Sequence, residues 1–144
     1  MLDKNGIIKR IVNSNMLAKK EINILKGLDF PDLLEYQKHI YNYVLYKFLL
    51  DDELDVDTKN LNELAMLSVE KAGRLNPNEQ ILLDVSKHCG ATSSYMTKKV
   101  LLFMSFDDEM GISLSDYPTA DIEDTDQLAE IIFMENLKRR SSNE

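Results

Sequence analysis

The chain has few of the residues that build metal and redox sites. Its 144 residues include one cysteine, two histidines and no tryptophan. The single cysteine, Cys89, excludes an intramolecular disulfide, and this set of Cys and His is too small to predict a zinc site. His88 stands beside Cys89, but neighbouring residues on a helix point about 100° apart, so the pair does not predict a catalytic dyad. A buried cysteine is the simpler interpretation.

Proline, glycine and long apolar runs are also scarce. Three Pro and five Gly leave few tight turns, which favours helices over a turn-rich β-fold. No stretch reaches the roughly 18 consecutive apolar residues that a membrane-spanning helix needs. The N-terminus also lacks an apolar core followed by a cleavage site. We therefore expect a cytoplasmic protein that does not associate with membranes.

Charge is unevenly distributed along the chain, whose formal net charge is −8. The first 26 residues hold six Lys and Arg against two acidic residues, whereas the part after residue 100 is strongly acidic until Lys138. An acidic surface repels nucleic-acid phosphates and attracts basic proteins. This distribution favours protein partners over nucleic acid.

Apolar periodicity and capping residues predict a chain of helices. Asp32 suits a helix start, Gly73, Gly90 and Gly111 suit helix ends, and Asp124 or Thr125 suits the start of the last helix. The predicted segments are 5–26 as one or two helices, 33–50, 60–72, 77–89, 93–110 and 127–137. For the helix up to Gly111, the pattern predicts a buried face of Met96, Val100, Leu101, Phe103, Met104, Phe106 and Met110.

The segment 100–132, "VLLFMSFDDEMGISLSDYPTADIEDTDQLAEII", resembles the second half of acyl carrier proteins, the phosphopantetheine-binding family. The shared order is an acidic cluster at the end of a helix, a glycine, an apolar–polar–apolar triplet, a polar loop and a capped last helix. The matching residues are Asp107, Asp108 and Glu109, then Gly111, then Ile112, Ser113 and Leu114. The loop "DDELDVDTKNLNEL" resembles the long first loop of the family. The similarity covers about residues 32–137, with about 28 additional residues between the halves and no intact Asp-Ser-Leu motif.

This resemblance implies a carrier that presents thioester-bound acyl or peptidyl intermediates on a 4′-phosphopantetheine arm, without catalysis of its own. The arm needs a serine at the start of the second main helix. Ser93 in "GATSSY" and Ser68 in "LNELAMLSVE" are the candidates, and an ungapped count back from Gly111 falls on Met96 instead. Either serine could equally be a helix cap or a surface residue. The resemblance also implies that Asp107, Asp108 and Glu109 meet Lys/Arg patches on partner synthases and transferases.

Two other interpretations remain open. Residues 84–100, "DVSKHCGATSSYMTKKV", are similar to the helix-turn-helix of DNA-binding regulators, with Met96 packed inward and Lys98 and Lys99 outward. The surrounding acidic charge argues against it. The other is a helical protein-interaction module without covalent chemistry. No triad, phosphate loop or metal-spaced set predicts an enzyme.

The sequence thus predicts an all-α protein. We expect an acyl-carrier-like four-helix bundle with extra helices over 32–137, preceded by a basic N-terminal helical extension over 1–31. Residues 138–144 are predicted to be a disordered basic tail.

Overall fold

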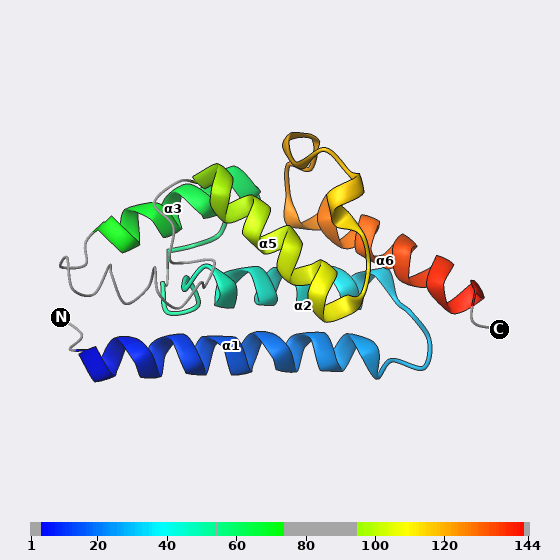
Figure 1. Cartoon of the computed structure of the whole chain (residues 1–144), viewed down its shortest axis with the longest axis horizontal. Helices are drawn as coiled ribbons and strands as arrows, with labels where there is room; N and C mark the ends of the chain where they lie inside the picture. The colour runs from blue at the N-terminus through cyan, green and yellow to red at the C-terminus, as the bar shows by residue number, and fades with distance from the viewer. Residues whose placement is uncertain (1–3, 54, 74–94, 143–144) are drawn as a thin grey trace.

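The described part of the computed structural model covers residues 4–53, 55–73 and 95–142, and it is helical (Figure 1). Its α-helices are α1 (Lys4–Lys26), α2 (Leu33–Lys47), α3 (Leu61–Gly73), α5 (Tyr95–Met110) and α6 (Thr125–Ser142), with 3₁₀ turns η2 (Leu114–Asp116) and η3 (Thr119–Asp121). The described residues contain no strand, only an isolated bridge between Asn60 and Asp124. The all-α prediction is confirmed for these residues. The helix predicted over 77–89 lies outside them.

Helices α1 and α2 pack antiparallel as the lower layers of the structure (Figure 1). α2 begins at Asp32, whose carboxylate accepts a hydrogen bond from the Leu34 backbone N–H at 3.0 Å, as an N-cap residue does. Near the other end of α2, the Arg10 guanidinium of α1 forms an ion pair with Asp51 at 2.6 Å. Of the one or two helices predicted over 5–26, the structure has one continuous helix.

The core runs through α1, α2, α3, α5 and α6, so α1 is part of the bundle. Ala18, Ile22 and Leu25 of α1 are at most 1% exposed and belong to the same buried cluster as α2 and α6. This differs from the prediction of a basic N-terminal helical extension over 1–31 that only precedes the bundle. The reason is that α1 buries an apolar face against α2, and such a face stabilises a helix mainly through packing.

Aromatic residues of α2 hold the centre of this core. The Tyr43 ring lies 4.4 Å from the Phe106 ring, centroid to centroid, and its hydroxyl donates to Ser105 Oγ at 2.9 Å. The Tyr36 ring packs edge-on against Phe133 at 5.3 Å. Both tyrosines are fully buried. Each ring supplies a large apolar area while its hydroxyl keeps a hydrogen-bond partner.

The end of α2 forms a Schellman motif, and α3 is anchored to it. The Leu50 N–H donates to the Leu45 carbonyl and the Leu49 N–H to the Tyr46 carbonyl, at 2.8 and 3.1 Å. Leu49 has φ 58°, in the left-handed region that usually favours glycine. Its carbonyl accepts a hydrogen bond from Lys71 Nζ of α3 at 2.6 Å. The side chain of Leu49 is buried, and that packing offsets the backbone strain.

The start of α6 is tied to the start of α3. The Thr125 N–H donates to the Lys59 carbonyl at 2.9 Å, and the Leu61 N–H donates to the Glu123 carbonyl at 2.8 Å. The Asp124 carboxylate caps α6 by accepting from the Gln127 N–H at 2.7 Å. Of the two predicted caps, Asp124 is therefore the one used.

Basic residues at the end of α6 remain helical. α6 continues to Ser142, so residues 138–142 are not the disordered tail that the sequence predicted. Arg139 Nη1 donates to the Met110 carbonyl at 2.6 Å, and Arg140 Nη2 donates to the Leu28 carbonyl at 3.2 Å. Cations are favourable near a helix C-terminus, and these two also bind carbonyls of other segments.

Candidate functional site

Helix α5 buries only part of the predicted face: Phe103, Phe106 and Met110 are buried as predicted. Its buried residues are Lys98, Lys99, Leu102, Phe103, Phe106 and Met110. Met96, Val100 and Met104 are 38%, 42% and 51% exposed, so the prediction that they are buried was wrong. Because they are spaced four residues apart, these three side chains form one row along the helix, which we call the α5 row. The periodicity did not reveal this because two lysines take positions on the buried face.

The two buried lysines contradict the placement that a DNA-reading helix requires. Lys98 and Lys99 are 0% and 1% exposed, whereas that interpretation turns them outward and turns Met96 inward. Lys99 Nζ donates to the Ile122 carbonyl at 3.2 Å. Burial lowers the pKa of Lys99, and the charge of nearby Glu123 opposes part of that effect. Residues 84–94 of that motif lie outside the described part.

Of the two candidate serines, only Ser68 lies in the described part of the structure. Ser68 is 3% exposed, and its hydroxyl donates to the Phe48 carbonyl at 2.8 Å within the core. Attachment of a phosphopantetheine arm requires an exposed hydroxyl, so the prediction of Ser68 as an attachment site does not fit this placement. Ser93 lies outside the described residues. Met96, its ungapped counterpart, lies in the first turn of α5 and is exposed.

The acidic residues at the end of α5 have separate surroundings, although the sequence predicted one partner-binding patch. Asp107 Oδ1 accepts a hydrogen bond from the Leu114 N–H at 2.6 Å and so closes the turn after α5. That turn also needs Gly111, whose φ of 65° is left-handed. Asp108 is exposed. Glu109 points toward α1, and its Oε2 atom is buried without a hydrogen-bond partner in the described structure.

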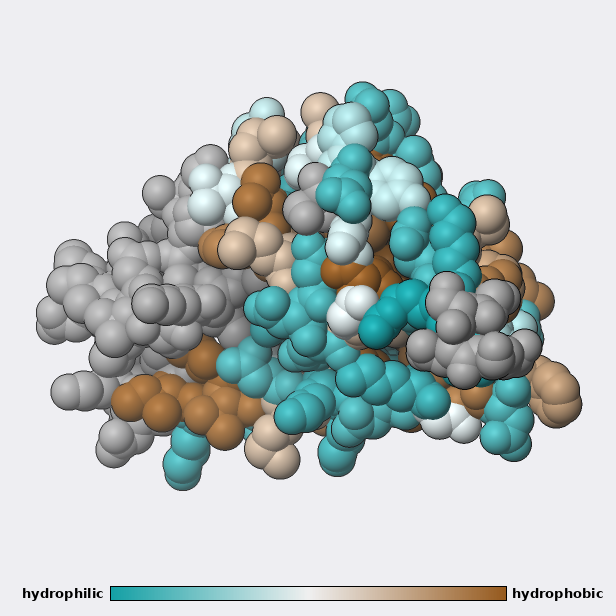
Figure 2. All heavy atoms as spheres, turned by 45° about the vertical axis from the view of Figure 1, so that its right-hand side comes forward, coloured by the Kyte–Doolittle hydropathy of each residue, from teal (hydrophilic) through white to brown (hydrophobic). Residues whose placement is uncertain are grey.

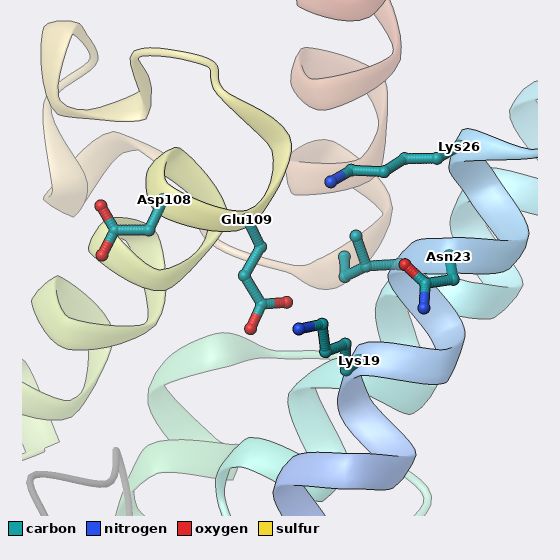
Figure 3. A pocket seen from close by; sticks show the side chains of 6 residues that line it. Lys19, Asn23, Lys26, Asp108 and Glu109 are labelled. Carbon is teal, nitrogen blue, oxygen red and sulfur yellow. The ribbon is translucent and has the colours of Figure 1, made fainter.

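A pocket lies between α1 and the end of α5, with a volume of about 260 Å³. Figure 3 shows Lys19, Asn23 and Lys26 on the α1 side and Asp108 and Glu109 on the α5 side. The Lys19 amine points toward the Glu109 carboxylate (Figure 3). We refer to this feature as the α1–α5 pocket. Sequence reasoning missed it because residues about 85 positions apart meet only in the folded chain.

A buried histidine also joins α1 to α2. His39 is 8% exposed; its Nδ1 lies 2.5 Å from Glu21 Oε2 and its Nε2 lies 3.1 Å from Glu35 Oε2. Both contacts are hydrogen bonds only when both ring nitrogens carry a proton. The carboxylates lie on opposite sides of the ring and do not converge, and the described residues contain no group of three or more His, Cys, Asp or Glu that could hold a metal ion. The i,i+4 spacing of Glu35 and His39 was the one sequence signal for this cluster.

Apolar surface gathers over the N-terminal half of α1 as well (Figure 2, lower left). There Ile8, Val12 and Met16 are exposed at four-residue spacing. Among the helices that the structure describes, none is long and apolar enough to cross a membrane.

Comparisons of the chain with protein-family models, curated protein sequences and solved structures found no match.

Proposed function

We propose that this chain is a helical protein-interaction module that docks on a partner through the exposed face of α5. The observation that carries the proposal is the α5 row, three large apolar side chains left exposed side by side on one helix. Single exposed apolar residues are common on protein surfaces, but an aligned row creates a continuous strip that water solvates poorly. Methionine suits such a strip because its flexible, polarisable side chain adapts to a partner surface.

The charge at the end of the row defines the chemistry of the partner. Asp108 lies one further step of four residues beyond Met104 and is exposed. A matching surface therefore has an apolar groove for Met96, Val100 and Met104, with a Lys or Arg at the end that meets Asp108. The chain as a whole, with a net charge of −8, would be steered toward such a basic partner. The proposal assigns no catalysis to this protein.

Quantitative co-purification with the tagged full-length chain tests the proposal. Val100→Glu places a charge in the middle of the α5 row, and we expect it to deplete the bound partner about tenfold or more. The matched control is Met134→Glu, which changes a similarly exposed side chain on α6. A partner retained by Met134→Glu and lost with Val100→Glu supports the proposal. Equal retention or equal loss in the two variants contradicts it.

A carrier function, with the arm on Ser93, is the second candidate. It is favoured by the segment from α5 through Gly111 to α6, in which Ile112 and Leu114 are buried and η2 and η3 precede a capped last helix. This order resembles that of the carrier family from the acidic cluster onward, which supports the candidate. In this version the enzymes that load and unload the arm would dock on the α5 row.

Intact mass separates the two candidates. The chain is incubated with a phosphopantetheinyl transferase and coenzyme A, beside the variants Ser93→Ala and Ser68→Ala. A carrier gains the mass of the arm, loses that gain in Ser93→Ala and keeps it in Ser68→Ala. Absence of any gain in the unaltered chain rejects the carrier and leaves the interaction module.

A further inference from the structure

The α1–α5 pocket places charges of opposite sign on opposite walls. Lys19 and Lys26 of α1 form the basic wall and Glu109 of α5 forms the acidic wall, while the carboxylate of Asp108, which also lines the pocket, points away from α1 (Figure 3). Ile22, which is part of the core, and the Asn23 amide complete the lining. No single one of these residues would define a site, but together they create a small space with two separate charge preferences.

These four charged groups do not neutralise one another directly. In the described structure, none of them makes an ion pair within 4.0 Å or a side-chain hydrogen bond, although the two walls belong to the same pocket. Among them, Glu109 gives the strongest indication of a binding site, because its Oε2 atom is buried and has no hydrogen-bond partner in the described structure. A buried polar atom without a hydrogen bond raises the free energy of the folded state. A bound group that donates a hydrogen bond to Glu109 would remove that cost.

We propose that this pocket binds a free α-amino acid. The α-ammonium group of the ligand would donate to Glu109, and its α-carboxylate would accept from Lys19 and Lys26. Asn23 offers an amide between the two walls, and Ile22 provides an apolar floor for a short side chain. A zwitterion fits better than a simple anion or cation because either of those leaves one wall unpaired.

Size supports the same class of ligand. The volume of about 260 Å³ is below the range of roughly 300–1,000 Å³ typical of pockets for drug-sized molecules and cofactors. It therefore suits a small ligand such as an amino acid. A peptide terminus offers only one of the two charges, so a free amino acid and a peptide are distinguishable. The proposal does not depend on the α5 row, because Glu109, the α5 residue that would bind the ligand, is not part of that row.

Titration of the full-length ¹⁵N-labelled chain with free amino acids tests the site by NMR. Glycine, alanine and glutamate are compared with N-acetylalanine and alaninamide, which each lack one of the two charges. We expect saturable shifts of the Asn23, Lys26 and Glu109 backbone amides with the free amino acids, and binding at least tenfold weaker for both capped forms. Equal binding of the capped forms, or no saturable shift with any free amino acid, overturns the proposal.

Variants locate the binding in this pocket. Glu109→Gln keeps the size of the side chain and removes its charge, and Lys26→Gln does the same on the opposite, exposed wall. Each should weaken binding of alanine about tenfold. Lys20→Gln is the control, because Lys20 is an exposed α1 lysine that does not line the pocket. If Lys26→Gln binds alanine as tightly as Lys20→Gln does, the proposed site is wrong. This comparison does not depend on whether Glu109→Gln folds.

Discussion

Truncation of Leu25 should destabilise the whole bundle, because this α1 side chain is 0% exposed within the shared core. Leu25→Ala removes three carbon groups, which at about 0.8 kcal/mol each is about 2.4 kcal/mol of lost burial. The cavity left behind adds to this, so we expect a loss of about 3 kcal/mol, within the usual range for such substitutions. For a chain of this length, that corresponds to a melting temperature lower by about 10 °C.

Urea denaturation followed by circular dichroism measures this loss. Ile24→Ala is the matched control, because Ile24 neighbours Leu25 on α1 but is 45% exposed. We expect the control to lose no more than about 0.5 kcal/mol, as is usual for surface substitutions. If the two variants differ by less than about 0.5 kcal/mol, α1 does not share the core, and the reasoning that joins it to the bundle is refuted.

Three further predictions concern single positions. Gly111→Ala should cost about 1–2 kcal/mol in thermal denaturation, because φ is left-handed and the new Cβ would lie 2.6 Å from Arg139 Nη1; an unchanged melting temperature contradicts this. Lys99→Met should raise the free energy of unfolding at pH 7. Because burial lowers the pKa of Lys99, the unaltered chain should become more stable as pH rises toward 10.5, and its difference from the variant should shrink. A difference in urea midpoint that stays constant from pH 7 to 10 contradicts this prediction. At Asp52, burial acts to raise the pKa, but the hydrogen bond from Lys71 and the charges of Arg10 and Lys71 outweigh it and lower the pKa. The stability that Asp52 contributes is therefore present above pH 3.8 and is lost as pH falls below that value. Asp52→Asn should reduce this acid-induced loss of unfolding free energy by well under about 1 kcal/mol, since the side chain is 57% exposed. The same loss in the variant and the unaltered chain refutes the assignment.

The helix boundaries could be predicted where local chemistry sets them. Asp32 and Asp124 cap α2 and α6 as the sequence indicated, and Gly111 ends α5 in the left-handed conformation that glycine adopts most easily. Each of these signals acts within about four residues of its position. Such local signals are visible in a sequence, and tertiary packing did not override them here.

The orientation of α5 could not be predicted, because it depends on a distant partner. Lys99 is buried where the Ile122 carbonyl can accept its hydrogen bond, and the residues around Lys99 in the sequence do not predict that contact. The same holds for Arg139, whose charge suggested a frayed tail but whose guanidinium binds the Met110 carbonyl. The burial of Ser68 likewise depends on the end of α2, where the Phe48 carbonyl accepts its hydrogen bond, and its neighbours in sequence do not indicate this contact.

The α1–α5 pocket depends most strongly on contacts between residues that are far apart in the sequence. Its basic wall comes from the N-terminal helix, which the sequence set apart as an extension, and its acidic wall comes from a residue expected to meet a partner protein. Only once α1 joins the core do Lys26 and Glu109 face the same space (Figure 3).

Site-specific photo-crosslinking in living cells most directly tests whether α5 is the docking face. A photoreactive amino acid is placed at position 100, in the middle of the α5 row, and in a second strain at position 134 on α6, which is exposed to a similar degree. We predict a discrete covalent adduct with one protein from position 100, and its disappearance when Met104 is changed to Glu in the same chain. Crosslinks that are the same from both positions, or that persist with Met104→Glu, would contradict a docking role for α5.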